Sequence, residues 1–149
     1  MTSRILLCSY RGEAYLEEQL ASIEGQTERN FRLLLSDDAS TDRSFAIGEA
    51  AAARDERITA IRRESGSGGA ARHFLEGLRD PHFFSAADES DYYLFSDQDD
   101  IWHPDKLAVE ARAMRCLEAR YGKALPLLVH CDMRVVDGAG REIAPSYVR

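Results

Sequence analysis

The stretch FRLLLSDDASTD, residues 31–42, is the part of the sequence from which the fold class follows. It opens with a nearly continuous apolar run, 31–35, and then changes abruptly to acidic and hydroxyl side chains. A continuous apolar run of this length is typical of a strand that is buried on both faces of a parallel sheet, because a strand with one wet face alternates. We therefore expect a buried strand that ends in a polar loop.

Similar apolar runs recur along the 149 residues, at Ile5–Cys8, Tyr92–Phe95 and Leu127–Cys131, with a weaker one at Ile58–Ile61. Between them, apolar residues at helical spacing predict four helices, over residues 16–23, 42–54, 70–78 and 104–117. Such alternation predicts right-handed βαβ units. We expect an α/β fold, a Rossmann-like, open and mostly parallel sheet with flanking helices.

Local signals refine this outline. Ser40 or Thr41 is the expected N-cap of the second helix, and Gly122 follows the end of the fourth. The segments 65–69 (SGSGG) and 81–91 are expected to be loops. Within 135–149, the dipeptides Asp137-Gly138 and Ala139-Gly140 predict a turn between two short strands.

Composition excludes some functions. The net charge of −7 argues against a protein that tracks nucleic-acid phosphates, which needs a basic face. Cys8, Cys116 and Cys131 form no CxxC pair, so buried inert thiols in a reducing compartment are the simplest interpretation. The first apolar run is too short for a signal peptide or a membrane span. We therefore expect a cytoplasmic protein whose association with the inner face of the membrane, if it has one, is peripheral.

Polar residues follow three of the predicted strands, at 9–13, 36–40 and 96–100. Ligands of open α/β sheets bind at the carboxyl ends of the strands. We expect the five aspartate carboxylates of these stretches to converge there, and because like charges repel, a divalent cation is the simplest resolution. The five are Asp37, Asp38, Asp97, Asp99 and Asp100.

Asp97 and Asp99 are two residues apart, so in an extended segment their side chains share a face. That pair suits Mg²⁺ or Mn²⁺, which use one or two carboxylates together with water and phosphate oxygens. A solvated turn that caps the following helix is the competing interpretation. For Asp37 and Asp38 the alternatives are a helix cap or a carboxylate that accepts the imide N–H of uracil or thymine. Trp102 fits either core packing or the rim of a sugar site.

Four stretches resemble the family 2 glycosyltransferases, and within them the bacterial rhamnosyltransferase-like group. They are LCSYRGEAYLEEQLASI (7–23), QTERNFRLLLSDDASTD (26–42), DYYLFSDQDDIWHPDKL (91–107) and the looser CDMRVVDGAGREIAPS (131–146). They cover most of the chain in the family's order, and the combination of SDDASTD with FSDQDDIWHPDKL is specific. The resemblance implies a GT-A fold, with residues 1–149 as one nucleotide-sugar-binding domain that lacks part of the acceptor side.

Residue roles follow from the resemblance alone. It implies that Asp37 or Asp38 contacts the pyrimidine, that Asp97 contacts the ribose or metal-bound water, and that Asp99 ligates Mn²⁺ or Mg²⁺ on the diphosphate. Asp132 would border the sugar site. The residues implied for the nucleotide pocket after the first strand are Ser9, Tyr10, Arg11 and Glu13.

This sequence departs from the family pattern at Arg11, where Asn is usual, and at His73-Phe74, where Asn-Phe is frequent. The family's general base has no counterpart that we can place in this chain.

The implied reaction is inverting transfer of a sugar from dTDP-rhamnose or a UDP-sugar to a glycan or lipid-linked acceptor, in cell-surface polysaccharide synthesis. A catalytically incomplete nucleotide-sugar-binding module is the alternative. A sugar-1-phosphate nucleotidyltransferase ranks third, because that class usually has a Gly-rich loop with Arg and Lys after the first strand, and SYRGEAY has one Arg and one Gly.

Overall fold

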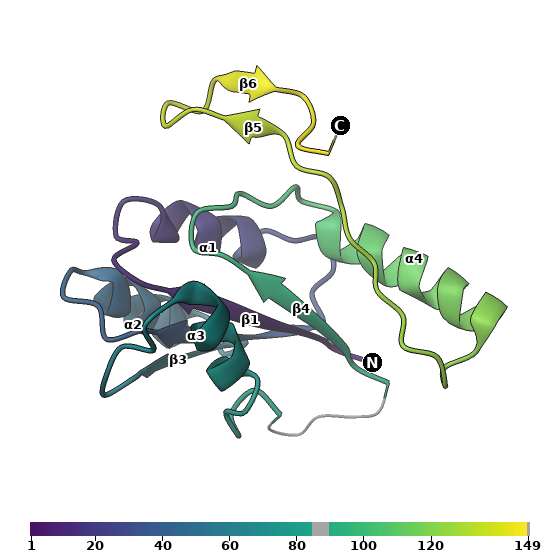
Figure 1. Cartoon of the computed structure of the whole chain (residues 1–149), viewed down its shortest axis with the longest axis horizontal. Coiled ribbons are helices and arrows are strands. Elements are labelled where there is room, and N and C mark those ends of the chain that lie inside the picture. Colours follow the sequence, from purple (N-terminus) through teal and green to yellow (C-terminus); the bar gives the residue numbers. More distant parts are fainter. Residues whose placement is uncertain (85–89, 149) are drawn as a thin grey trace. The chain divides into compact units, whose positions relative to one another are not determined.

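A four-stranded parallel sheet is built from strands within residues 3–96 of the computed structural model, which describes residues 1–84 and 90–148 (Figure 1). The strands lie in the order β3-β2-β1-β4, so the chain steps outward from β1 in one direction and then crosses back to place β4 on its other side. The predicted α/β fold with a mostly parallel sheet is confirmed. The strands are β1 (Ser3–Ser9), β2 (Phe31–Asp37), β3 (Ile58–Arg62) and β4 (Tyr92–Ser96).

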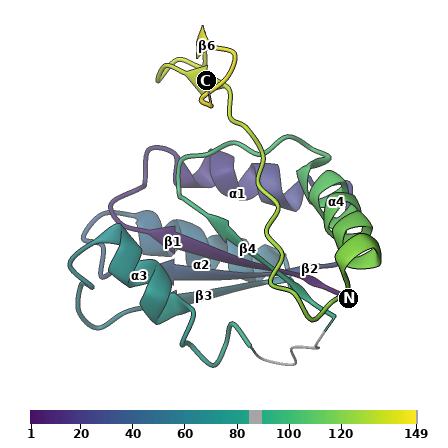
Figure 2. The same ribbon diagram turned by 45° about the vertical axis from the view of Figure 1, so that its right-hand side comes forward.

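Both faces of β1 are buried, which explains its continuous apolar run. Ile5 and Leu7 belong to the core cluster shared with α1 (Leu16–Glu24) and α2 (Ser44–Arg54), whereas Leu6 and Cys8 point to the opposite face, toward α3 (Ala70–Gly77). Figures 1 and 2 show α3 on the other side of the sheet from α1 and α2. Each fully buried aliphatic side chain contributes about 1.5–3 kcal/mol to stability.

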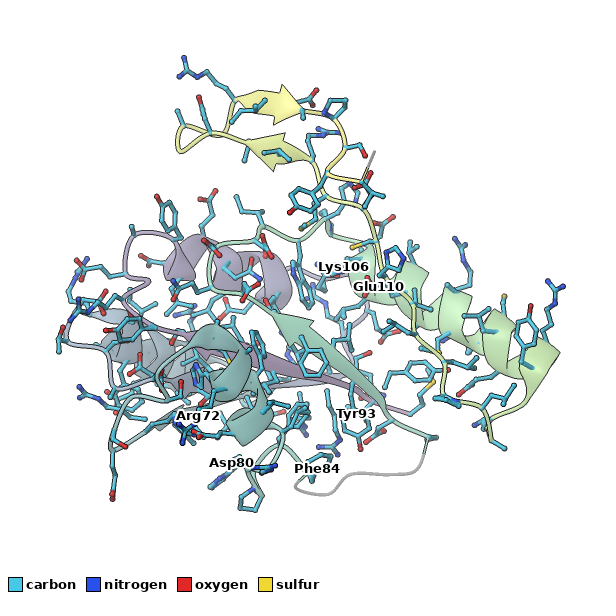
Figure 3. The ribbon with its side chains drawn as sticks, viewed as in Figure 1. Arg72, Asp80, Phe84, Tyr93, Lys106 and Glu110 are labelled. Atoms are coloured by element: carbon cyan, nitrogen blue, oxygen red, sulfur yellow. The ribbon has the colours of Figure 1, made fainter. Side chains whose placement is uncertain are left out.

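Close packing of α3 against β1 depends on Gly77. A Cβ at this position would lie 2.8 Å from Cδ2 of Leu6, so a larger residue would push the helix away from the sheet. Near the start of β4, the rings of Phe83, Phe84 and Tyr93 contact one another, with centroids 5.3–5.7 Å apart. Figure 3 labels Phe84 and Tyr93.

The cap of α2 differs from the prediction. The helix begins at Ser44, and the carboxylate of Asp42 accepts hydrogen bonds from both the backbone N–H (3.0 Å) and the hydroxyl (2.6 Å) of Ser44. Ser40 and Thr41, predicted as caps, lie too early in the chain for this role. The predicted helix, 42–54, includes Asp42, whereas in the structure Asp42 precedes the helix and accepts the backbone N–H of its first residue.

Residues Met1–Ala108 and Val109–Arg149 form two compact units, and α4 (Lys106–Tyr121) runs from the first into the second. Gly122 ends α4 with a φ of 81°, as predicted, and its N–H donates to Glu118 O at 2.8 Å. In the second unit, β5 (Val135–Val136) and β6 (Glu142–Ala144) pair in an antiparallel hairpin, which confirms the predicted turn.

The predicted strand at Leu127–Cys131 is wrong. The segment has no regular secondary structure, and no strand within 1–84 or 90–148 pairs with it. Leu128 is 82% exposed, so the run lacks the two covering faces that define a buried strand. An apolar run becomes a strand only where a neighbour accepts its backbone hydrogen bonds. For the predicted loop at 81–91, residues 81–84 form turns and residues 85–89 lie outside the described part.

None of the helices in the described part of the chain is long and apolar enough to cross a membrane.

Candidate functional site

A cleft of about 590 Å³ lies at the carboxyl ends of β1, β2 and β4. Because Ser9 pairs in register with Asp37 and Leu7 with Ser96, the polar ends of β2 and β4 flank the end of β1. This confirms that the residues after these strands share one edge of the sheet. The cleft is lined by Cys8, Ser9, Tyr10, Asp38, Gly66, Gly68, Gly69, Ala70, His73, Phe74, Asp97, Gln98 and Asp99.

Asp38 forms one side of the cleft and is held by a residue 29 positions later. Its Oδ1 accepts a hydrogen bond from the backbone N–H of Ser67, and its Oδ2 accepts one from the Ser67 hydroxyl, both at 2.7 Å. The Nε of Arg63 lies 3.5 Å from Oδ1. These contacts satisfy and orient the carboxylate, although only 6% of the residue is exposed.

Asp37 does not line the cleft. It is fully buried, and its carboxylate accepts hydrogen bonds from the backbone N–H of Ser40 at 2.9 Å and from the hydroxyl of Ser9 at 3.3 Å. In the turn between Asp37 and Ser40, Ala39 has a φ of 57°. Asp37 therefore stabilises the tight turn after β2, and Asp38 is the aspartate of this pair that faces the cleft.

Asp97 and Asp99 form the side of the cleft that follows β4. Burial raises the pKa of Asp97, and the negative charge of Asp99 raises it further. The pKa of Asp100 is raised by burial and by the charges of Asp97 and Asp99, with Lys106 opposing the rise. Asp100 is absent from the cleft lining, as is Asp37. The expectation that five carboxylates share the crevice is therefore wrong, and three line it.

Ser9 and Tyr10 line the cleft as expected, but the next two predicted residues do not. The backbone N–H of Arg11 donates to the Ser40 hydroxyl at 3.0 Å, and φ at Arg11 is 50°. The carboxylate of Glu13 accepts the backbone N–H of Arg43, just before α2, at 2.9 Å. Arg11 thus ties the loop after β1 to the turn after β2, and Glu13 ties it to the start of α2.

Trp102 packs in the core with α1 and β1, and Nζ of Lys106 lies 5.0 Å from the centroid of its ring. Figure 3 labels Lys106 at the start of α4. Only 7% of Trp102 is exposed, so core packing, one of the two interpretations above, accounts for it. Asp132 lies in the second unit, where its carboxylate accepts hydrogen bonds from the Ser146 hydroxyl and from the N–H groups of Tyr147 and Val148. These bonds lower its pKa to about 2. Its role at the sugar remains a prediction.

Sequence reasoning missed two residues of the cleft lining, Gln98 and His73, and also Ser67, which holds Asp38. Gln98 lies between the two acidic residues, and its Oε1 accepts the backbone N–H of Tyr10 at 2.8 Å. Ser67 is buried inside the glycine-rich segment, and buried His73 contacts the Ser36 hydroxyl through Nε2 at 2.9 Å. Two signals in the sequence could have identified these residues: Gln98 is a polar residue within an acidic motif, and His73 departs from the family pattern.

The donor set at Asp97 and Asp99 fits a divalent cation that is completed by substrate. Within residues 1–84 and 90–148, no three His, Cys, Asp or Glu side chains cluster as a protein-only metal site would require. Mg²⁺ and Mn²⁺ do not need one, because they are often held by one or two carboxylates and phosphate oxygens. A cation here would also offset the repulsion that raises the pKa of Asp97.

Comparison with known proteins identifies relatives. The model of glycosyl transferase family 2 matches residues 4–119. The dTDP-rhamnosyl transferase RfbG of Shigella flexneri is 35% identical over 112 residues, which are 74% of this chain and 36% of RfbG. The succinoglycan biosynthesis protein ExoW of Rhizobium meliloti is 34% identical over 108 residues, 70% of this chain and 31% of ExoW. The chain thus spans about a third of these relatives' length.

Solved structures share the fold. TarS 1–349 of S. aureus, in complex with UDP, has a TM-score of 0.60 and 22% identity, over 80% of this chain and 32% of TarS 1–349. The mannosyltransferase PcManGT of Pyrobaculum calidifontis, in complex with GDP-Man and Mn²⁺, has a TM-score of 0.60 and 23% identity, over 77% of this chain and 32% of PcManGT.

Proposed function

Because the chain belongs to glycosyl transferase family 2, we propose that its cleft binds a nucleoside-diphosphate sugar as the donor of a glycosyl transfer. One observation supports this most strongly: Asp38 faces the cleft from the end of β2, and Asp97 and Asp99 face it from the end of β4. A nucleotide sugar has a base with hydrogen-bond donors and a diphosphate that needs positive charge. Asp38 can accept a hydrogen bond from the base, and Asp97 and Asp99 can hold a cation that supplies the positive charge.

The base would bind at Asp38. A carboxylate accepts the imide N–H of uracil or thymine, whereas the corresponding ring nitrogen of cytosine has no hydrogen to donate. A UDP-sugar or dTDP-rhamnose is therefore the proposed donor. The similarity to a dTDP-rhamnosyl transferase and to a protein that binds UDP agrees with this choice.

The diphosphate would lie toward Asp97 and Asp99, which would hold Mn²⁺ or Mg²⁺. The cation, when bound, supplies positive charge against the leaving diphosphate. The chain's own residues bind and orient: Ser9 and Tyr10 form the floor between the two sides, and Gln98 holds the loop of Tyr10 to the loop after β4.

The transfer itself would be a single displacement with inversion. A base would take the proton of an acceptor hydroxyl, which attacks the anomeric carbon from the face opposite the diphosphate. We propose a glycan or lipid-linked acceptor of cell-surface polysaccharide synthesis, at the inner face of the membrane. No residue of this chain is assigned as the base.

The test is nucleotide binding by calorimetry, with and without Mn²⁺, in the wild type and in Asp99→Asn. We expect the wild type to bind UDP or dTDP more tightly with Mn²⁺, and Asp99→Asn to lose at least about tenfold in affinity, or roughly 1.4 kcal/mol. Glu17→Gln, an exposed change on α1 outside the cleft, is the matched control. Equal metal-dependent affinity in wild type and Asp99→Asn would refute the metal site.

A second measurement separates transfer from binding alone. Release of UDP or dTDP from the sugar donor, including slow hydrolysis, indicates turnover. Tight binding without any release would favour the binding-module alternative. A thermal-shift comparison of UDP, dTDP, GDP and CDP establishes the base preference, since a ligand of the folded state raises its apparent stability.

A further inference from the structure

The glycine-rich segment 65–69 is attached to the cleft through the hydrogen bonds of Ser67 with the Asp38 side chain. Ser67 is buried, with 5% of its surface exposed, whereas its neighbours in the segment are exposed. A Cβ placed on Gly68 or Gly69 would meet nothing within 4 Å, so this part of the segment has no packing of its own. Gly68 also has a φ of 86°, which a larger residue rarely adopts. The position of the segment therefore depends on Ser67.

Ser67 bonds to both oxygens of the Asp38 carboxylate. Its backbone N–H donates to Oδ1 and its hydroxyl to Oδ2, each at 2.7 Å. The hydroxyl also lies 3.2 Å from the carbonyl oxygen of Gly69, but its one hydrogen is directed best at the closer, charged acceptor. Two donors from one residue fix the plane of the carboxylate as well as its position.

The surroundings reinforce this orientation. Arg63 carries a positive charge whose Nε is 3.5 Å from Oδ1 of Asp38, and its guanidinium also pairs with Glu76 of α3. A carboxylate has about four lone-pair sites, so the two bonds from Ser67 leave acceptor capacity on Asp38. A base can therefore bind to Asp38 while the segment stays attached.

We propose that Ser67 is a positioning residue, which holds segment 65–69 as a wall of the cleft and orients Asp38 to accept the imide N–H of a uridine or thymidine diphosphate. The proposal rests on the proposed function, because it presumes that the base binds at Asp38. It adds a coupling: the nucleotide and the segment share one carboxylate, so ordering the segment strengthens nucleotide binding, and bound nucleotide orders the segment in return.

The test compares Ser67→Ala with Ser65→Ala, a matched change in the same segment at an exposed serine. Ser67→Ala removes the hydroxyl bond and keeps the backbone N–H bond, so the fold should survive, which the thermal unfolding midpoint checks. Without nucleotide, hydrogen exchange of the amides in 65–69 should rise about tenfold in Ser67→Ala and stay at the wild-type rate in Ser65→Ala. Unchanged exchange in Ser67→Ala would overturn the attachment.

The second measurement is affinity for UDP and for CDP with Mn²⁺. In Ser67→Ala we expect UDP affinity to fall about tenfold and CDP affinity to change less, so that the preference for UDP shrinks, because a loosened carboxylate no longer selects the imide donor. A looser segment with an unchanged preference would show that Ser67 only tethers the segment, and would overturn the proposal. If the wild type binds no nucleotide, the proposed function fails first, and the exchange experiment still judges the attachment separately.

Discussion

Gln98 and Tyr10 join two loops that are 88 residues apart in sequence: Oε1 of Gln98 accepts the backbone N–H of Tyr10 at 2.8 Å. Gln98 lies between Asp97 and Asp99, and Tyr10 follows Ser9, so the bond connects the acidic side of the cleft to its floor. The absent side chain of Gly12 makes room for it, since a Cβ there would lie 2.3 Å from Oε1.

Gly12→Ala should therefore displace the Gln98 side chain and break this bond. Because the clash is with the end of a flexible side chain, we expect a modest loss of stability, about 0.5–1.5 kcal/mol, the value of one hydrogen bond. Nucleotide affinity should fall as well, since the two loops are no longer tied. Urea unfolding measures the first effect and calorimetry the second. Gly138→Ala, where a Cβ meets nothing within 4 Å, is the control and should be neutral.

A larger effect is expected at the other end of the sheet, where Nε of Arg4 lies 2.7 Å from Oδ2 of Asp91 and both side chains are buried. Asp91→Ala would leave the guanidinium buried without this carboxylate, which typically costs about 3–5 kcal/mol. The exposed pair of Arg134 with Glu142 is the comparison, and Glu142→Ala should cost less than about 1 kcal/mol. Similar losses in both variants by urea unfolding would contradict the role assigned to burial.

The elements were predictable where burial dominates the sequence pattern. The apolar runs of β1 and β2 are continuous because helices cover both faces of those strands. The same pattern misled at Leu127–Cys131, since an apolar run does not reveal whether a neighbouring strand exists. Local pattern thus predicted the units of the sheet but not which runs join it.

The site was predictable to the level of the strand end and no finer. Asp37 and Asp38 are adjacent and chemically identical, yet one stabilises a turn and the other faces the cleft. The two aspartates differ in the hydrogen-bond partner of each carboxylate. The partner of Asp38 is Ser67, which lies 29 residues away in a segment whose sequence predicts only a loop. Long-range hydrogen bonds of this kind leave no local signal in one sequence.

The pH dependence of stability should report His73. Burial lowers its pKa below 6.5, an effect to which Arg63 adds and which the charges of Asp38, Asp37 and Glu76 oppose. The unfolded chain therefore takes up this proton at a higher pH than the folded protein does, so acid favours unfolding. The free energy of unfolding should rise with pH through the window between the lowered pKa and 6.5, and this contribution should be complete above it.

His73→Asn should remove that slope, although loss of the contact with Ser36 also lowers stability at every pH. Urea unfolding at several values between about pH 5 and pH 7 measures the slope. Ser36→Ala, which removes the same contact but keeps the imidazole, is the control and should keep the pH slope. A His73→Asn protein with an unchanged slope would mean that another group carries the pH dependence.

Thiol reactivity gives a last and simple check of the cleft. Burial, together with the charges of Asp97 and Asp38, raises the pKa of Cys8 to about 12, so at pH 8 this thiol stays protonated and reacts slowly. Cys116 and Cys131 are exposed. A thiol reagent such as DTNB should therefore label two sites rapidly in the folded protein and a third only on unfolding. Cys8→Ala should leave the native count at two and reduce the unfolded count to two. Rapid labelling of three thiols in the folded wild type would contradict the burial of Cys8 at the edge of the cleft.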